Sequence, residues 1–92
     1  MISSTSIIER SADQVSCELD GEIVLMSTAT GKYFKLDNIG ARIWLLLETP
    51  AKLADIVETI LNEYEVSPEQ GEREITAFIH QLLASNFICA SE

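Results

Sequence analysis

The chain has 92 residues, of which 47% are hydrophobic and 23% charged, so it has the size and composition of one globular domain. Its 15 acidic residues against 6 basic ones give a formal net charge of −9. Nucleic-acid binding depends largely on Lys and Arg that neutralise phosphates, so this charge argues against a DNA or RNA partner. For the same electrostatic reason it argues against binding to an anionic membrane surface.

No motif for catalysis or metal binding stands out. Cys17 and Cys89 lie far apart without a CxxC pair, and His80 is the single histidine, so the spacing of zinc ligands is absent. Cys17 falls on the apolar face of a predicted strand, which favours a small core residue over a reactive thiol. His80 has no carboxylate or thiol partner nearby in sequence, which favours a boundary or surface histidine over a general base. We therefore expect no enzymatic activity, no metal and no cofactor.

The hydrophobic runs predict a cytoplasmic protein that does not enter a membrane. The N-terminal residues lack the basic segment and the apolar core of a signal peptide. The longest unbroken apolar run, Ile43 to Leu47, is far shorter than a membrane span. Free thiols are expected in such a compartment, although a disulfide between the two cysteines stays open.

The N-terminal third predicts an arm and then a first strand. Residues 1–14 are rich in Ser, Thr and charged residues with isolated isoleucines, a composition that supports neither strand nor helix and predicts a mobile arm. From Val15 onward, alternation puts Val15, Cys17 and Leu19 on one face. This pattern predicts a half-buried strand.

Two further strands are predicted after a tight turn. Asp20-Gly21 suits a two-residue hairpin, because both turn positions need a positive φ that Asp and Gly tolerate. The second strand, Glu22 to Thr28, is apolar on both faces and should lie in the middle of the sheet. The third strand, Lys32 to Leu36, should flank it on the side opposite the first strand. Both outer strands then keep a free edge.

Three helices are predicted to follow the strands. Asp37 and Asn38 are good caps for the first helix, which is apolar enough to be buried on most sides. Pro50 suits the first turn of the second helix, whose apolar residues have the clearest amphipathic spacing in the chain. Ser67 opens the third helix with a capping box. Residues 87–90 are expected to return as a short extended tail.

This order of elements predicts an α+β fold, with a three-stranded antiparallel meander packed on three helices, in a domain that spans residues 15–90. The same elements also describe a winged helix, so a DNA-binding regulator is an alternative of another class. A DNA-reading helix needs basic residues, but residues 53–74 contain seven acidic residues and one basic residue. The charge therefore makes DNA binding the weaker alternative.

The third strand is the candidate binding element. Alternation puts Phe34 and Leu36 on one face and Tyr33 and Lys35 on the other. If Phe34 and Leu36 join the core, an extended peptide can add itself to the open edge as a fourth strand and bind through main-chain hydrogen bonds. The alternative is an ordinary edge strand that its lysines protect from pairing. The pattern leaves both possibilities open.

The segments GKYFKLD, NIGARIWLLLE and ITAFIHQLLASNFI, together with the DG hairpin, resemble the PqqD-like family over about Val15 to Ile88. These proteins are the recognition elements of pathways that modify ribosomally made peptides. The resemblance implies a winged-helix-like fold of three strands and three helices without enzymatic activity. It also implies that the leader segment of a precursor peptide binds as an added strand on the third strand, beside the third helix, and is presented to a modifying enzyme.

The resemblance is greatest to the stand-alone leader-binding proteins of lasso-peptide biosynthesis, which implies a leader peptidase and a cyclase as partners, with no nucleic acid and no membrane. The alternative within the family is a peptide chaperone for a radical-SAM enzyme in pyrroloquinoline quinone synthesis. An acidic residue on the third helix, Glu72 or Glu74, is also implied. The implied peptide contacts are Tyr33, Phe34, Lys35 and Leu36 on the strand and Arg73, Thr76, Ile79 and His80 on the helix.

Overall fold

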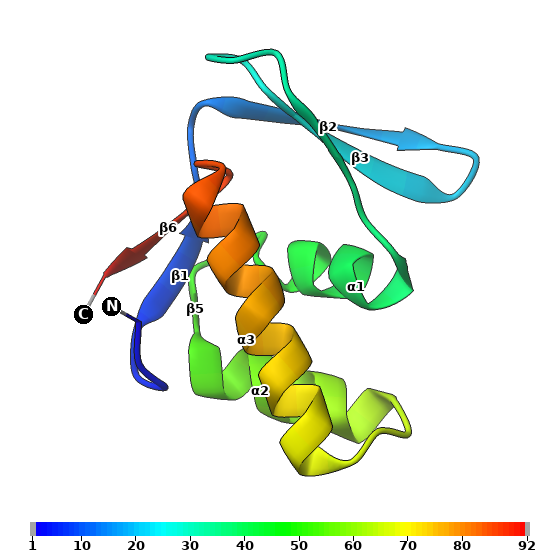
Figure 1. Ribbon diagram of the computed structural model, residues 1–92, viewed down its shortest axis with the longest axis vertical. Helices are drawn as coiled ribbons and strands as arrows, with labels where there is room; N and C mark the ends of the chain where they lie inside the picture. Colours follow the sequence, from blue (N-terminus) through cyan, green and yellow to red (C-terminus); the bar gives the residue numbers. More distant parts are fainter. Residues whose placement is uncertain (1, 92) are drawn as a thin grey trace.

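The computed structural model describes residues 2–91, and Figure 1 shows their arrangement. A β-hairpin with a short third strand lies over one side of a layer of helices, and a second small sheet holds the two ends of the chain. The elements in chain order are β1 (Ile7–Arg10), β2 (Gln14–Leu19), β3 (Glu22–Ser27), β4 (Tyr33–Lys35), α1 (Asn38–Leu46), β5 (Ala51–Lys52), α2 (Leu53–Glu63), α3 (Pro68–Ala84) and β6 (Ile88–Ser91).

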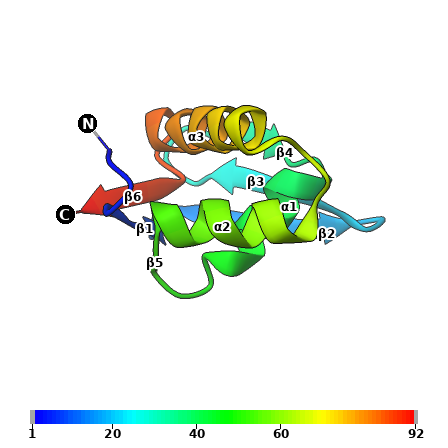
Figure 2. The same cartoon turned by 90° about the horizontal axis from the view of Figure 1, so that it is seen from below.

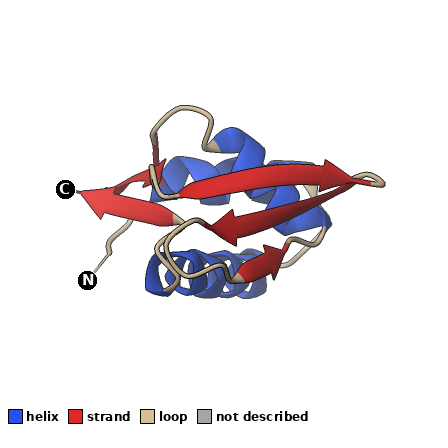
Figure 3. Ribbon diagram, turned by 90° about the horizontal axis from the view of Figure 1, so that it is seen from above, coloured by secondary structure: helices blue, strands red, loops and turns tan. Residues whose placement is uncertain are grey.

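The predicted antiparallel meander is confirmed. The strand order of this sheet is β2-β3-β4, with β3 in the middle. At the hairpin, Asp20 has φ 53° and Gly21 has φ 81°, the left-handed conformations that a two-residue turn requires. The strands cross above the helices in Figure 3. The α+β fold follows from these local signals.

The prediction that residues 1–14 contain no strand is wrong. Ile7–Arg10 forms β1, the central strand of a second sheet with the order β5-β1-β6, and the Ile8 side chain is fully buried. Both partners of β1 are distant in sequence, since Ile8 pairs with Ala51 in β5 and with Ala90 in β6. Ile8 is the single fully buried residue of this strand, and its neighbours in sequence are mostly polar. One buried residue gives no periodic hydrophobic pattern, so the sequence could not reveal this strand.

The start of α2 also differs from the prediction, because the helix begins at Leu53 and not at Pro50. No side chain caps its N-terminus. Instead, the Leu53 amide donates to the Ser6 carbonyl at 3.0 Å and the Ala54 amide donates to the Ser4 carbonyl at 2.9 Å. The N-terminal segment thus supplies acceptors for helix amides that would otherwise lack partners. Pairing with β1 keeps the residues just before Leu53 extended.

The predicted burial of one face of β2 is wrong as well. Val15 is 43% exposed, Leu19 is 60% exposed, and Cys17 is exposed rather than part of the core. The helices pack on the opposite face of the sheet, where Leu25 of β3 is fully buried. Ser16 and Glu18, on the other face of β2, are exposed as well, so the helices cover the middle strand of the sheet and leave most of β2 open to solvent.

The predicted helix caps are confirmed at α1 and α3. The Gly40 amide donates to Asp37 Oδ1 at 2.7 Å, and the Gln70 amide donates to Ser67 Oγ at 3.3 Å. After α3, Asn86 adopts φ 62° and the chain turns into β6, so the expected extended tail is present as a strand. The largest side chains buried between these layers are Trp44, Phe87, Ile8, Leu25, Ile43 and Leu47.

An ion pair connects α1 to α2 at the surface. Arg42 Nε lies 2.8 Å from Glu63 Oε1, and Arg42 Nη2 donates to Glu63 Oε2 at 2.9 Å. This hydrogen-bonded contact lowers the pKa of the Glu63 carboxyl, and the attraction between the two charges adds to the effect. Arg42 is therefore already engaged with an acidic partner. Across residues 2–91, no helix combines the length and apolar character needed to cross a bilayer.

Candidate peptide-binding site

Strand β4 forms an open edge of its sheet. It pairs with β3 on one side, and no strand among residues 2–91 pairs with its other side. Helix α3 runs next to this edge, as Figure 2 shows from below. An unpaired strand beside a helix is the geometry in which an extended peptide can complete a sheet and also contact a helix face.

The hydrogen bonds between β3 and β4 define which main-chain groups of β4 face the open edge. The Leu36 amide donates to the Ile23 carbonyl at 2.9 Å, and the Lys32 carbonyl accepts from the Ser27 amide at 2.9 Å. Successive residues of a strand direct their main-chain groups to opposite sides. The amide and carbonyl groups of Tyr33 and Lys35 therefore point away from β3, toward the open edge.

The side chains of β4 and of Leu36, which follows directly after it, alternate between the two faces as predicted. Leu36 is buried at 3% exposure, and Phe34 is half-buried. Tyr33 is 73% exposed, and the Lys35 ammonium pairs with Glu22 at 2.8 Å on the outer face of the sheet. The strand is thus anchored by Phe34 and Leu36, while the main-chain groups of the other two residues remain available.

Aromatic contacts connect the anchored face of β4 to α3 and to the chain that follows it. The Phe34 and Phe78 ring centroids are 6.1 Å apart with an interplanar angle of 68°. Phe34 makes a similar edge-to-face contact with Phe87 at 6.2 Å. Such contacts stabilise packing beyond the area they bury. Phe78 therefore marks the face of α3 that lies next to β4.

The structure does not bring the predicted helix residues to this face. Arg73, Thr76 and His80 lie roughly 140–160° around the helix axis from Phe78, given about 100° of rotation per residue. They line a separate shallow depression to which no described residue of β4 contributes. Ile79 is fully buried in the core. Arg73, Thr76 and His80 therefore lie away from the strand residues of the predicted site, whereas Ile79 shares the core with Leu36.

Sequence reasoning missed Phe78 as a residue next to the edge strand, and Glu74 as a residue that lines a cavity beside Phe78. Both were visible in the sequence, and their spacing of four residues places them on one side of a helix. The resemblance implies Glu74 only as an alternative to Glu72. The missing information is the rotation of α3 relative to β4, which depends on tertiary packing.

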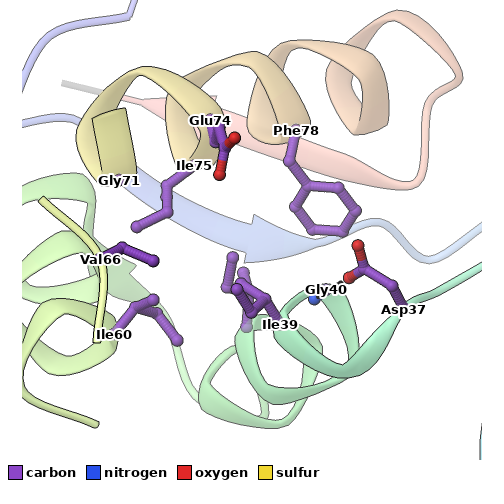
Figure 4. A pocket seen from close by; sticks show the side chains of 10 residues that line it. Asp37, Ile39, Gly40, Ile60, Val66, Gly71, Glu74, Ile75 and Phe78 are labelled. Carbon is purple, nitrogen blue, oxygen red and sulfur yellow. Dashed lines mark hydrogen bonds between the residues drawn. The ribbon is translucent and has the colours of Figure 1, made fainter. Parts of the chain in front are cut away.

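A cavity of about 230 Å³ lies between α1, α2 and α3, close to the point where the chain passes from β4 into α1 (Figure 4). Small-molecule pockets usually measure about 300–1,000 Å³, so this cavity has room for a side chain rather than for a cofactor. Asp37 and Glu74 contribute carboxylates, and the Phe78 ring lies between them in Figure 4. The apolar part of the lining comes from Ile39, Ile43, Ile60, Val66 and Ile75.

The other candidate groups do not form a reactive centre. Cys17 and Cys89 are free and exposed, so no disulfide joins them. Within the described range, residues 2–91, no cluster of three or more His, Cys, Asp and Glu side chains could hold a metal ion. What the chain does offer is an open strand edge, an adjoining helix face and a small cavity. Those features together define a peptide-recognition domain.

Comparison with known proteins identifies the family. The family described as "Coenzyme PQQ synthesis protein D (PqqD)" matches residues 22–88, and the chain therefore belongs to the PqqD family. Domains of this family bind peptides and are not catalytic, so the chain is a binding protein and not an enzyme. Among curated proteins, none matches this chain.

Two solved structures are similar to this one. The first, "TbiB1 in Complex with the TbiA(beta) Leader Peptide", is 38% identical, with a TM-score of 0.79 over 87% of this chain and 93% of that chain. The second, "Lasso peptide synthetase B1 complexed with the leader peptide", is 24% identical, with a TM-score of 0.74 over 89% of this chain and 96% of that chain. The second likeness supports the fold alone.

Proposed function

We propose that this protein binds the leader segment of a ribosomally made precursor peptide as an added strand on β4. The main observation is the open edge, where the main-chain groups of Tyr33 and Lys35 face away from β3 next to α3. Similarity to TbiB1, which was solved with a leader peptide, supports the proposal. Main-chain hydrogen bonds supply affinity in this binding mode, and pockets for alternate side chains supply specificity.

The biological role that follows is tethering in lasso-peptide biosynthesis. A bound leader holds the rest of the precursor near a modifying enzyme and raises its effective concentration there. The enzymes that would receive the peptide are a leader peptidase and a cyclase. The likeness to TbiB1, which was solved with a leader peptide, supports leader binding. The resemblance of the sequence favours the lasso pathway, while the family match to PqqD supports the alternative of a peptide chaperone in pyrroloquinoline quinone synthesis. The exposed free thiols suit a cytoplasmic place of action.

Titration of the protein with the leader peptide of the precursor encoded beside its gene tests this function. Fluorescence anisotropy of a labelled leader should show saturable binding with a dissociation constant in the low micromolar range or below. A scrambled leader of the same composition is the control, since the net charge of −9 attracts any basic peptide. Absence of saturation at several hundred micromolar leader would refute the proposal.

Substitutions on the two sides of α3 should affect leader affinity differently. We place the helix contacts of the leader on the side of Phe78, because that ring touches β4. Arg73→Ala and His80→Ala should therefore change the dissociation constant less than about twofold, as expected for exposed residues outside an interface. Loss of binding in either variant, measured by the same anisotropy titration, would instead support the contacts that the sequence resemblance implies.

A further inference from the structure

The cavity of Figure 4 lies just beyond the end of β4. Asp37, which lines it, follows directly after Leu36 at the end of the strand, and Phe78, on its opposite wall, contacts Phe34 within the strand. A peptide paired with β4 therefore passes the mouth of the cavity. In a sheet, directly opposite residues project to the same face. The peptide residue opposite Leu36 thus points its side chain to the helix side of the sheet, the side on which the cavity lies.

Close packing at Gly40 defines the end of the cavity next to β4. A Cβ atom at this position would lie 3.1 Å from Asp37 Oδ1 and 3.1 Å from two atoms of the Phe78 ring. The absence of a side chain at Gly40 therefore lets α1 and the Phe78 ring approach each other closely. The carboxylate of Asp37 is held in place by its hydrogen bond to the Gly40 amide. One end of the cavity consequently has a defined shape and a defined charge.

The charges around the cavity have one sign. Asp37 and Glu74 are the charged residues among the described residues that line it, and both are exposed acids. Figure 4 shows the Glu74 carboxylate directed toward the space between α3 and α1. The nearby basic residue of α1, Arg42, is engaged with Glu63. The rim therefore has an unmatched negative charge above an apolar floor.

We propose, as a refinement of the proposed function and resting on it, that this cavity selects a Lys or Arg side chain of the leader. The aliphatic stem of such a side chain packs along the isoleucines of the floor, and its cationic end reaches the carboxylates of Asp37 and Glu74. A carboxylate side chain is repelled there. A purely apolar side chain fits the floor but gains nothing from the rim. The cavity thereby determines one position of the leader by charge as well as by shape.

The test compares substituted leaders on wild-type protein and on an Asp37→Asn/Glu74→Gln variant. The probes are the leader encoded beside the gene and its derivatives in which each residue in turn is Lys, norleucine or Glu. Norleucine retains the aliphatic stem and removes the charge. Asn is as good a helix cap as Asp, so the variant should keep α1 intact. Equal affinity of both proteins for the norleucine peptides checks that the variant still folds and still binds.

At one leader position, wild-type protein should bind the Lys peptide about fivefold or more tightly than the norleucine peptide, and the Glu peptide most weakly. This preference should weaken at high salt and disappear in the variant. If wild type binds the leader but no position shows a Lys preference that the variant removes, the charge selection is overturned while leader binding stands. If wild type does not bind the leader at all, both proposals fail.

Discussion

Replacing Lys35 with proline is expected to weaken leader binding by about 10- to 30-fold while the fold survives. The Lys35 amide points toward the open edge, so proline removes a donor that an added strand needs and leaves a carbonyl of the leader unpaired. The ladder to β3 does not use this amide. Proline is also compatible with an edge strand, and it restricts the preceding residue to the extended region that Phe34 already occupies.

Lys35→Ala is the matched control for this prediction. It removes the ammonium group and the exposed ion pair with Glu22 but keeps the main-chain amide. Since exposed ion pairs contribute only about 0–1 kcal/mol, its effect on leader affinity should stay within about twofold. Anisotropy titrations give the affinities, and thermal melts show whether the variants fold. Equal losses for the proline and alanine variants would mean that the leader reads the side chain and not the strand edge.

Ile8→Ala is expected to lower the free energy of unfolding by about 2–5 kcal/mol, the usual cost of truncating a fully buried Ile. The side chain belongs to the core between the helices and the β5-β1-β6 sheet. Domains of this kind are stable by only about 5–15 kcal/mol, so this loss is a large part of the total. Urea denaturation followed by circular dichroism measures it as a lower midpoint at unchanged slope.

Val15→Ala is the comparison for Ile8→Ala. The sequence pattern predicts the larger loss of stability for the Val15 variant, whereas the structure predicts the larger loss for the Ile8 variant. The sequence pattern assigns Val15 to a half-buried strand and Ile8 to a mobile arm. In the structure Val15 is 43% exposed and Ile8 fully buried, so the Val15 variant should lose less than about 1 kcal/mol. A larger loss for Val15→Ala than for Ile8→Ala would contradict the packing of β1 in the core.

The parts of the fold that were predictable are those with local causes. The hairpin turn depends on the conformational freedom of Asp20 and Gly21, and the helix starts at Asp37 and Ser67 depend on side-chain caps. The family resemblance rests on the same segments, because its motifs surround β4 and α1. These features require no knowledge of where distant residues lie.

The sequence by itself determined the α+β class, the meander, the open edge at β4 and the alternation that separates Phe34 from Tyr33. Only the tertiary structure decided that Ile7–Arg10 is a strand, that β2 is exposed on both faces, and which side of α3 lies next to the open edge. The reason is physical. Turns and caps are stabilised by neighbours in sequence, whereas β1 pairs with both Ala51 and Ala90, and the rotation of α3 is set by packing against Phe34. Contacts between such distant residues leave no periodic pattern in either segment.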